Sequence, residues 1–242
     1  MNYETLLVDK DKRGGVSLTL NRPEKRNALS AKMIDELTIF AASLTSDIRV
    51  TVIQGAGNLF CAGGDLEWMH AQIKADRSIR IAEARKLAFM LKALNELPVP
   101  LIAKVHGAAY GGGVGLACIC DLVISCSNVK FGFTETRLGL IPSTIGPYVV
   151  GKMGQAKARE VFMSGKIFSE LKAKKLNIVS EVSDDLDQSV EDQINSYLKT
   201  APKAVGEAKA LVRSLGATID DNCLLYTSDA ADERSSVDLG GR

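Results

Sequence analysis

Three consecutive glycines interrupt an apolar stretch, HGAAYGGGVGLACICD at 106–121, and this feature constrains the fold most. Glycine loses more conformational freedom on folding than any other residue, so such a run is costly unless something approaches the backbone closely. The preceding PLIAKVHG at 100–107 is typical of a buried strand, and the apolar residues after the glycines predict a short helix. A strand that passes through glycines into a helix leaves backbone N–H groups free to bind a phosphate or an oxyanion.

Three glycine templates do not fit this segment. The dinucleotide pattern G-x-G-x-x-G fails because its third glycine would be Leu116 or Cys118. The P-loop pattern fails because Gly113 stands where that pattern needs a lysine. The G-x-S-x-G nucleophile elbow is absent from the sequence. An oxyanion-binding site is therefore the chemistry that the glycines leave open.

A second segment, FCAGGDL at 60–66, has the same character. Small residues follow a predicted strand there, and Asp65 can cap a short helix. One backbone donor from each segment would then converge on a single carbonyl oxygen. The alternative is that both segments are tight strand-to-helix turns without a ligand.

The bulk properties exclude several classes of protein. The net charge of +1 gives no electrostatic reason to expect a nucleic-acid or anionic-membrane partner. No segment approaches the roughly 18 consecutive apolar residues of a membrane span. Five cysteines without paired spacing and only two histidines argue against a structural metal. We therefore expect a cytoplasmic protein with no metal, no membrane association and no nucleic-acid partner.

Strands and helices alternate along the chain, which predicts an α/β fold with much parallel pairing. The predicted strands lie at 15–20, 49–55, 100–107, 121–127, 129–133 and 176–182. The predicted helices lie at 31–45, 78–96, 145–163, 169–175, 186–199 and 202–215. The polar, aperiodic end of the chain from 227 predicts a disordered tail.

Four segments resemble, in order and spacing, the enoyl-CoA hydratase/isomerase (crotonase) superfamily: NRPEKRNALS, FCAGGDLEWM, VHGAAYGGGVGLACICD and FGFTETRLGLIP. CAGGDLEWM, GGGVGL and GLIPSTIGPYVV are most similar to bacterial methylglutaconyl-CoA hydratase-like members. The resemblance implies a spiral of ββα repeats over 1–195. It also implies the start of a helical region at 196–222 that packs homotrimers or dimers of trimers. Residues 223–242 depart from the family pattern, and we expect them to form a disordered tail.

The resemblance also implies an acyl-CoA thioester substrate and no separate cofactor, because coenzyme A is part of the substrate. The thioester oxygen would accept hydrogen bonds from the N–H groups of Ala62 and Gly112. The residues expected around the substrate are Lys25, Arg26, Ala28, Ala62, Gly63, Gly64, Asp65, Leu66, Trp68, Tyr110, Gly111 and Gly115, with Tyr148 as a further aromatic candidate.

Hydratases of this family commonly carry two catalytic glutamates, and this chain has only one of them. Gly115 occupies the first position and Glu135 the second. Phe131, Phe133 and Glu135 alternate, so on a strand they would share a face and the apolar neighbours would raise the pKa of Glu135. The alternative is a solvated carboxylate paired with Arg137.

One carboxylate suffices for an isomerase that moves a double bond from the 3 to the 2 position. It also suffices for a hydratase when the proton of water is relayed. The resemblance favours hydration of a branched enoyl-CoA, such as occurs in leucine degradation, with the isomerase as the alternative and an inert family member third. A distal carboxylate on such a substrate would need a cation, which the sequence does not identify.

Overall fold

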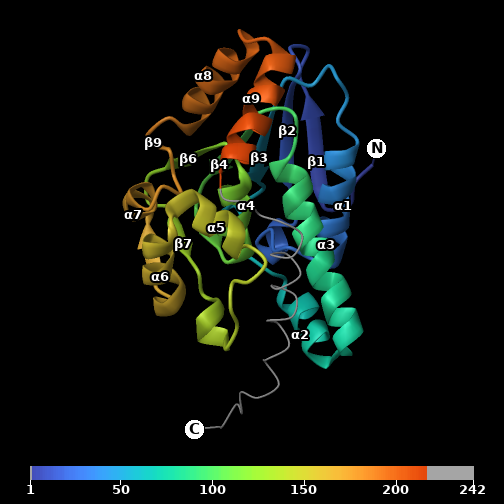
Figure 1. The fold of residues 1–242 in the computed structure, drawn as a ribbon, viewed down its shortest axis with the longest axis vertical. Helices are drawn as coiled ribbons and strands as arrows, with labels where there is room; N and C mark the ends of the chain where they lie inside the picture. Colours follow the sequence, from blue (N-terminus) through green and yellow to red (C-terminus); the bar gives the residue numbers. More distant parts are fainter. Residues whose placement is uncertain (1, 217–242) are drawn as a thin grey trace.

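The computed structural model describes residues 2–216, which form two sheets surrounded by helices (Figure 1). The larger sheet has the strand order β1-β2-β3-β4-β6-β9. Its strands are β1 Leu6–Lys10, β2 Gly15–Leu20, β3 Val50–Gly55, β4 Leu101–Val105, β6 Leu122–Cys126 and β9 Glu181–Ser183. The pair β1–β2 is antiparallel and the other pairs of this sheet are parallel, which confirms the predicted α/β class.

A smaller sheet combines β5 Ala108–Tyr110, β7 Lys130–Gly132 and β8 Ile167–Ser169. The strands β5 and β7 are parallel, so both run toward the same edge of this sheet. From that edge β5 leads into the helix α4 Gly112–Ile119, and β7 leads into the 3-10 turn η2 Glu135–Leu138. The small sheet therefore brings the glycines and Glu135 together.

The helix α4 is buried from Gly113 to Ile119 and packs against α3 and α5. A helix that is apolar on all sides belongs in the interior of a protein. The other helices are α1 Ala31–Ala42, α2 Leu66–Lys74, α3 Arg77–Asn95, α5 Gly146–Met153, α6 Gln155–Ser164, α7 Glu170–Lys175, α8 Leu186–Leu198 and α9 Pro202–Leu215, with a 3-10 turn η1 at Pro23–Lys25. Figure 1 shows α2 and the start of α3 at one end of the molecule and α8 and α9 at the other.

Several predicted elements differ from those observed. The predicted helix 145–163 is two helices, because Gly154 between them adopts a φ of 81° that ends α5. The predicted strand 176–182 is observed only as the shorter β9, and the sequence pattern did not predict the short strands β1, β5 and β8. The strand near 129–133 ends at Gly132, so Glu135 does not continue a strand face with Phe131 and Phe133.

The division of the chain expected from the sequence can be located on the elements of the structure. The boundary between 195 and 196 falls inside α8, and the helical character expected after it is present in α9. The tail expected at 223–242 lies outside the described residues. Across residues 2–216, no helix has the length and apolar content needed to cross a membrane.

The segment from Arg22 to Leu29 fastens one of the two glycine loops to the sheet. Asn27 is fully buried, and its side-chain amide donates to the carbonyls of Ala56 at 2.7 Å and Leu59 at 2.9 Å. Its Oδ1 accepts the N–H of Arg22 at 3.0 Å. Asn27 also has a φ of 51°, a left-handed conformation that asparagine tolerates better than most residues. Three hydrogen bonds and one backbone conformation therefore depend on this side chain.

We expect Asn27→Ala to lower the free energy of unfolding by about 2–4 kcal/mol, because it leaves buried backbone groups without partners. Urea unfolding followed by circular dichroism measures this change. The matched control is Asn58→Ala, at an exposed position of the neighbouring loop, and it should change stability by less than about 0.5 kcal/mol. Equal effects of the two substitutions would contradict the assigned role of Asn27.

Candidate active site

Two loops pack backbone against backbone where the sequence places its glycines. A Cβ atom at Gly63 would lie 2.8 Å from the carbonyl oxygen of Tyr110, and one at Gly113 would overlap the carbonyl oxygen of Cys61. Gly63 also has a φ of 96°, which side chains rarely allow. The backbone that approaches the GGG segment closely is therefore, in the first place, that of the other loop, FCAGGDL.

The hydrogen bonds of these loops decide which backbone N–H groups remain available. The N–H of Ala62 donates to the carbonyl of Arg26 at 3.0 Å, and Ala62 does not line the cavity beside the loops. The next residues are held by Leu29, whose N–H donates to Gly63 O at 2.7 Å. No hydrogen bond among residues 2–216 uses the N–H of Gly64 or Gly112.

Gly64 and Gly112 both line the cavity, so the geometry does not fit Ala62 as the donor expected from the sequence and favours Gly64 in its place. The physical reason is a backbone hydrogen bond between segments that are far apart in the sequence. Ala62 is bonded to the segment that contains Arg26, and the turn at Gly63 then leaves the following N–H without a partner. Gly112 keeps its predicted position, as the first residue of α4, where backbone N–H groups have no partner within the helix.

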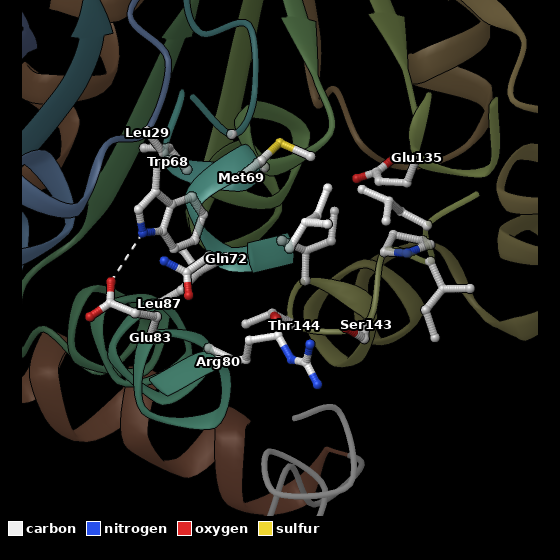
Figure 2. Close-up of a pocket in the computed structure, with 18 residues that line it drawn as sticks. Leu29, Trp68, Met69, Gln72, Arg80, Glu83, Leu87, Glu135, Ser143 and Thr144 are labelled. Atoms are coloured by element: carbon white, nitrogen blue, oxygen red, sulfur yellow. Dashed lines mark hydrogen bonds between the residues drawn. The ribbon is translucent and has the colours of Figure 1, made fainter. Parts of the chain in front are cut away.

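The cavity has a volume of about 290 Å³ and lies between these loops, the helices α2 and α3, and the segment before α5 (Figure 2). Most of its lining side chains are apolar. They are Leu29, Gly64, Trp68, Met69, Gln72, Ile73, Arg80, Glu83, Ala84, Leu87, Gly112, Glu135, Leu140, Ile141, Pro142, Ser143, Thr144 and Ile145. A pocket of this kind, apolar with a few polar groups, is typical of a small-molecule site.

The carboxyl group of Glu135 lies against the GGG segment. Its Oε1 would lie 2.9 Å from a Cβ at Gly111, and its Oε2 is buried without a hydrogen-bond partner. Burial raises the pKa of Glu135 above its ordinary value, as the sequence predicted, although the residue begins a 3-10 turn and not a strand. It forms no ion pair with Arg137 in the described part of the chain, so the solvated alternative does not hold. A carboxyl group in this state is suited to acid–base catalysis.

The first glutamate position of the family is closed by another side chain. A Cβ at Gly115 would overlap Cγ2 of Ile145, which lines the cavity. Ile145 therefore fills the volume that a longer side chain at 115 would need. Ile145 lies 30 residues further along the chain, and no local sequence signal connects it with Gly115.

The other predicted residues divide between the cavity and its surroundings. Trp68 lines the cavity, whereas Tyr110 and Tyr148 do not, and Tyr148 is buried in the core. Asp65 caps α2, accepting the N–H groups of Glu67 at 2.9 Å and Trp68 at 3.3 Å. The predicted positions that lie outside the cavity lining are Lys25, Arg26, Ala28, Ala62, Gly63, Asp65, Leu66, Gly111 and Gly115.

Two of these outlying residues have partners that explain their positions. Lys25 forms an exposed ion pair with Glu67 at 2.7 Å. Asp65 accepts a hydrogen bond from Arg22 at 2.8 Å. Burial acts to raise the pKa of Asp65, but the hydrogen bonds from Arg22 and from the backbone at the start of α2 outweigh it, so the pKa is lowered. Both contacts join the segment before α1 to the start of α2.

Sequence reasoning missed the wall that α2 and α3 contribute. Met69, Gln72 and Ile73 come from α2, and Arg80, Glu83 and Leu87 from α3. The sequence predicted a short helix capped by Asp65 and a longer helix at 78–96, but not which faces of these helices meet the loops. Within residues 2–216, no group of three or more His, Cys, Asp or Glu side chains is arranged to hold a metal ion.

Comparison with known proteins shows the family to which the chain belongs. The sequence pattern described as enoyl-CoA hydratase/isomerase matches residues 11–234. A Mycobacterium tuberculosis protein named "Probable enoyl-CoA hydratase echA8" is 36% identical over 77% of this chain and 72% of its own length.

Solved structures agree with that match. A crystal structure of an enoyl-CoA hydratase from Shewanella pealeana superimposes with a TM-score of 0.86, at 32% identity, over 98% of this chain and 90% of the other. Pseudomonas aeruginosa AtuE superimposes with a TM-score of 0.84, at 34% identity, over 99% of this chain and 93% of the other.

The raised pKa of Glu135 predicts how the stability of the folded protein changes with pH. The folded protein holds the proton of Glu135 more tightly than the unfolded chain does, so this group lowers stability as the pH rises from the unfolded pKa through the folded one. Glu135→Gln removes that penalty. We expect the variant to be more stable than the wild type at pH 7–8, with the difference disappearing as the pH falls toward about 4.5.

Thermal unfolding across this pH range measures the effect. Glu207→Gln, at an exposed position on α9, is the control and should leave the pH dependence unchanged. A Glu135→Gln variant that is less stable than wild type at pH 8, with its core intact by circular dichroism, would show that the carboxylate is stabilised and not strained by its surroundings.

Proposed function

Because the chain belongs to the enoyl-CoA hydratase/isomerase family, we propose that it is an enoyl-CoA hydratase that adds water across the 2,3 double bond of an acyl-CoA thioester. One observation carries this proposal: the Glu135 carboxyl group, whose Oε2 is buried without a hydrogen-bond partner, lies against the same loop whose Gly112 N–H is unengaged. Relatives at 33–36% identity carry hydratase names, which supports hydration as the reaction. We propose a branched, methylglutaconyl-like acyl group as the substrate on the sequence resemblance.

The backbone donors would stabilise the charge that develops during the reaction. Attack of water at C3 of the conjugated thioester moves negative charge onto the thioester oxygen, which becomes an enolate. We assign the N–H groups of Gly64 and Gly112 to this oxygen, because both line the cavity and neither is engaged elsewhere in the described chain. Each such donor is worth on the order of 3 kcal/mol of barrier in comparable sites. Without them, the enolate would form in an apolar cavity with nothing to neutralise it.

Glu135 would handle both protons. In its ionised form it takes a proton from water while the water oxygen bonds to C3. The same carboxyl group, now protonated, returns that proton to C2 of the enolate, so the net change is addition of one water. Burial assists this exchange, since a raised pKa brings the group closer to the working pH than an exposed glutamate would be. These steps need no cofactor besides the coenzyme A of the substrate.

The isomerase remains a second candidate for a specific reason. Ile145 overlaps the volume that a side chain at Gly115 would need, so the first glutamate position of the family is closed. An isomerase needs one base that removes a proton from C2 and returns it to C4. Glu135 meets that requirement as well as it meets the requirement of a hydratase.

We further propose that the protein assembles as a homotrimer or a dimer of trimers in the cytoplasm. Leu211, Val212 and Leu215 on α9 are 58%, 69% and 77% exposed, which supports a partner face there. The described cysteines, Cys61, Cys118, Cys120 and Cys126, are all free thiols, which fits a reducing compartment.

Two assays test the reaction. With crotonyl-CoA and methylglutaconyl-CoA we expect loss of the conjugated enoyl absorbance, and Glu135→Gln should slow it by about 10²–10⁴-fold. Turnover of neither substrate would refute the hydratase. A 3-enoyl-CoA separates the candidates, because its conversion to the conjugated 2-enoyl product in the absence of hydration would establish the isomerase.

Gly112 allows a direct test of the backbone donor. It is the first residue of α4, a position where proline fits a helix, so Gly112→Pro removes the N–H with little cost to the fold. We expect kcat to fall about 10²–10³-fold. Gly112→Ala is the matched control, because it adds a Cβ at 3.0 Å from the movable Cδ1 of Leu29 but keeps the N–H. Equal loss in both variants would attribute the effect to crowding and not to the donor.

A further inference from the structure

The indole ring of Trp68 connects the two helices of the cavity wall with the loop that carries Gly64. Its Nε1 donates a hydrogen bond to Oε2 of Glu83 on α3 at 3.0 Å (Figure 2). At the opposite edge of the ring, Cζ3 lies 3.9 Å from the position that a Cβ of Gly64 would occupy. Trp68 itself belongs to α2, so this one side chain joins both helices to the loop.

The acceptor of this hydrogen bond is a carboxylate with two donors. Oε1 of Glu83 accepts from Lys86 at 2.7 Å, and Oε2 accepts from Trp68. Burial acts to raise the pKa of Glu83, but these two donors outweigh it, so the pKa is lowered and the group is ionised at neutral pH. Hydrogen bonds to an ionised acceptor are about twice as strong as those between neutral groups. Because an indole has a single N–H donor and no acceptor, Glu83 determines which way this edge of the ring faces.

The peptide unit between Gly63 and Gly64 is held by hydrogen bonding at its carbonyl end. The carbonyl oxygen of Gly63 accepts from the N–H of Leu29 at 2.7 Å. In a planar trans peptide the N–H points in the opposite direction to the carbonyl, so this bond also directs the N–H of Gly64. A single hydrogen bond sets that direction but leaves the peptide plane able to tilt about it.

Two side chains of α2 lie against Gly64 and limit this tilt. The atoms nearest to a Cβ placed at Gly64 belong to Met69, with Sδ at 2.9 Å, and to Trp68. A methionine side chain has three rotatable bonds and adapts to its surroundings, whereas an indole is rigid. The ring of Trp68, held from its far edge by Glu83, is therefore the rigid support beside the Gly64 N–H.

We propose that Glu83 is a positioning residue for the Gly64 N–H and acts on it through the ring of Trp68. This inference rests on the proposed function, because that function assigns the Gly64 N–H to the thioester oxygen. A displaced donor still contacts the neutral thioester, but it stabilises the charge of the enolate less well. Loss of the bond between Glu83 and Trp68 should therefore lower kcat and leave KM nearly unchanged.

Three substitutions separate this hydrogen bond from the bulk of the side chains. Glu83→Leu removes the acceptor, Trp68→Phe removes the donor, and Glu83→Gln keeps an acceptor oxygen. With crotonyl-CoA we expect kcat to fall about 5–50-fold in the first two variants, which is less than the loss of a whole donor would cause. Glu83→Gln should stay within about threefold of the wild type, and KM should change by less than about threefold in both Glu83 variants. Trp68→Phe and Glu83→Leu combined should be no slower than the slower single variant, because both remove the same bond.

The carbonyl stretch of a bound thioester measures the donor directly and needs no turnover. Butyryl-CoA is saturated and cannot be hydrated, and a heavy carbon isotope at its thioester carbonyl separates the signal from the protein amides. Infrared difference spectroscopy should show this frequency lowered on binding to the wild type, because N–H donors polarise the C=O bond. We expect Glu83→Leu to lose much of the shift and Glu83→Gln to retain it.

Fluorescence reports the other end of the same contact. Trp68 is the only tryptophan of the chain, so its emission shows whether the ring changes its surroundings when the acceptor is removed. We expect the emission maximum to shift in Glu83→Leu. Arg85→Leu is the matched control, because Arg85 is exposed on the same helix and does not line the cavity. It should leave kcat, the carbonyl shift and the emission unchanged.

Two results would overturn the positioning role. One is a Glu83→Leu variant with the kcat and the carbonyl shift of the wild type, which would reduce the hydrogen bond to a structural link between α2 and α3. The other is a wild type that binds butyryl-CoA without lowering its carbonyl frequency, which would remove the Gly64 donor as well. Thermal unfolding of each variant confirms that the comparison concerns folded protein.

A failure of the reaction itself is distinguished by the same measurements. If the carbonyl shift of bound butyryl-CoA depends on Glu83 but no enoyl-CoA is turned over, the reaction fails while the donor and its positioning stand. If the wild type and Glu83→Leu hydrate crotonyl-CoA with equal kcat, the role of Glu83 fails and the proposed function stands.

Discussion

Close approach of two backbones, at Gly63 beside Tyr110 and at Gly113 beside Cys61, fixes the position of everything else in the site. Any side chain at these glycines would push the loops apart, and the two N–H groups assigned to the thioester would no longer meet at one cavity. The small sheet extends the same arrangement to the acid, because β5 and β7 run in parallel and the N–H of Gly111 donates to Gly132 O at 2.9 Å. Glu135 follows three residues later, with its carboxylate against Gly111.

The burial of Glu135 has opposite consequences for stability and for chemistry. An acidic side chain without a hydrogen-bond partner for Oε2 disfavours its own ionised form, which weakens the folded state near neutral pH. The same desolvation makes the group a better proton donor and acceptor in that range. Because Ile145 fills the space that a second glutamate at position 115 would need, Glu135 alone carries both the cost in stability and the proton chemistry. A destabilising group of this kind is expected at a functional site, where a residue is retained for its chemistry although it lowers stability.

The sequence predicted those parts of the site that depend on neighbouring residues. The glycine spacing predicted both loops, the Asp65 cap and the helix start at Gly112, all of which are present. It pointed to Ala62 as the second donor, whereas the hydrogen bond from the Ala62 N–H to Arg26, more than 30 positions earlier, leaves Gly64 as the residue with a free N–H. Glu135 was identified on the wrong kind of element, since the strand stops at Gly132. Ile145 and Arg80 have no local signature, and only the folded chain brings them to the cavity.

The glycine end of the cavity has a specific electrostatic requirement. Charge is absent there in the ground state and appears on the thioester oxygen during the reaction, so fixed backbone dipoles meet it without a permanent cation. Glu135 lines the same apolar cavity, and a second unpaired carboxylate placed there would raise its pKa further and reduce the ionised fraction that activates water. Stabilisation of the transient charge by backbone N–H groups and control of the catalytic proton are thus parts of a single charge balance.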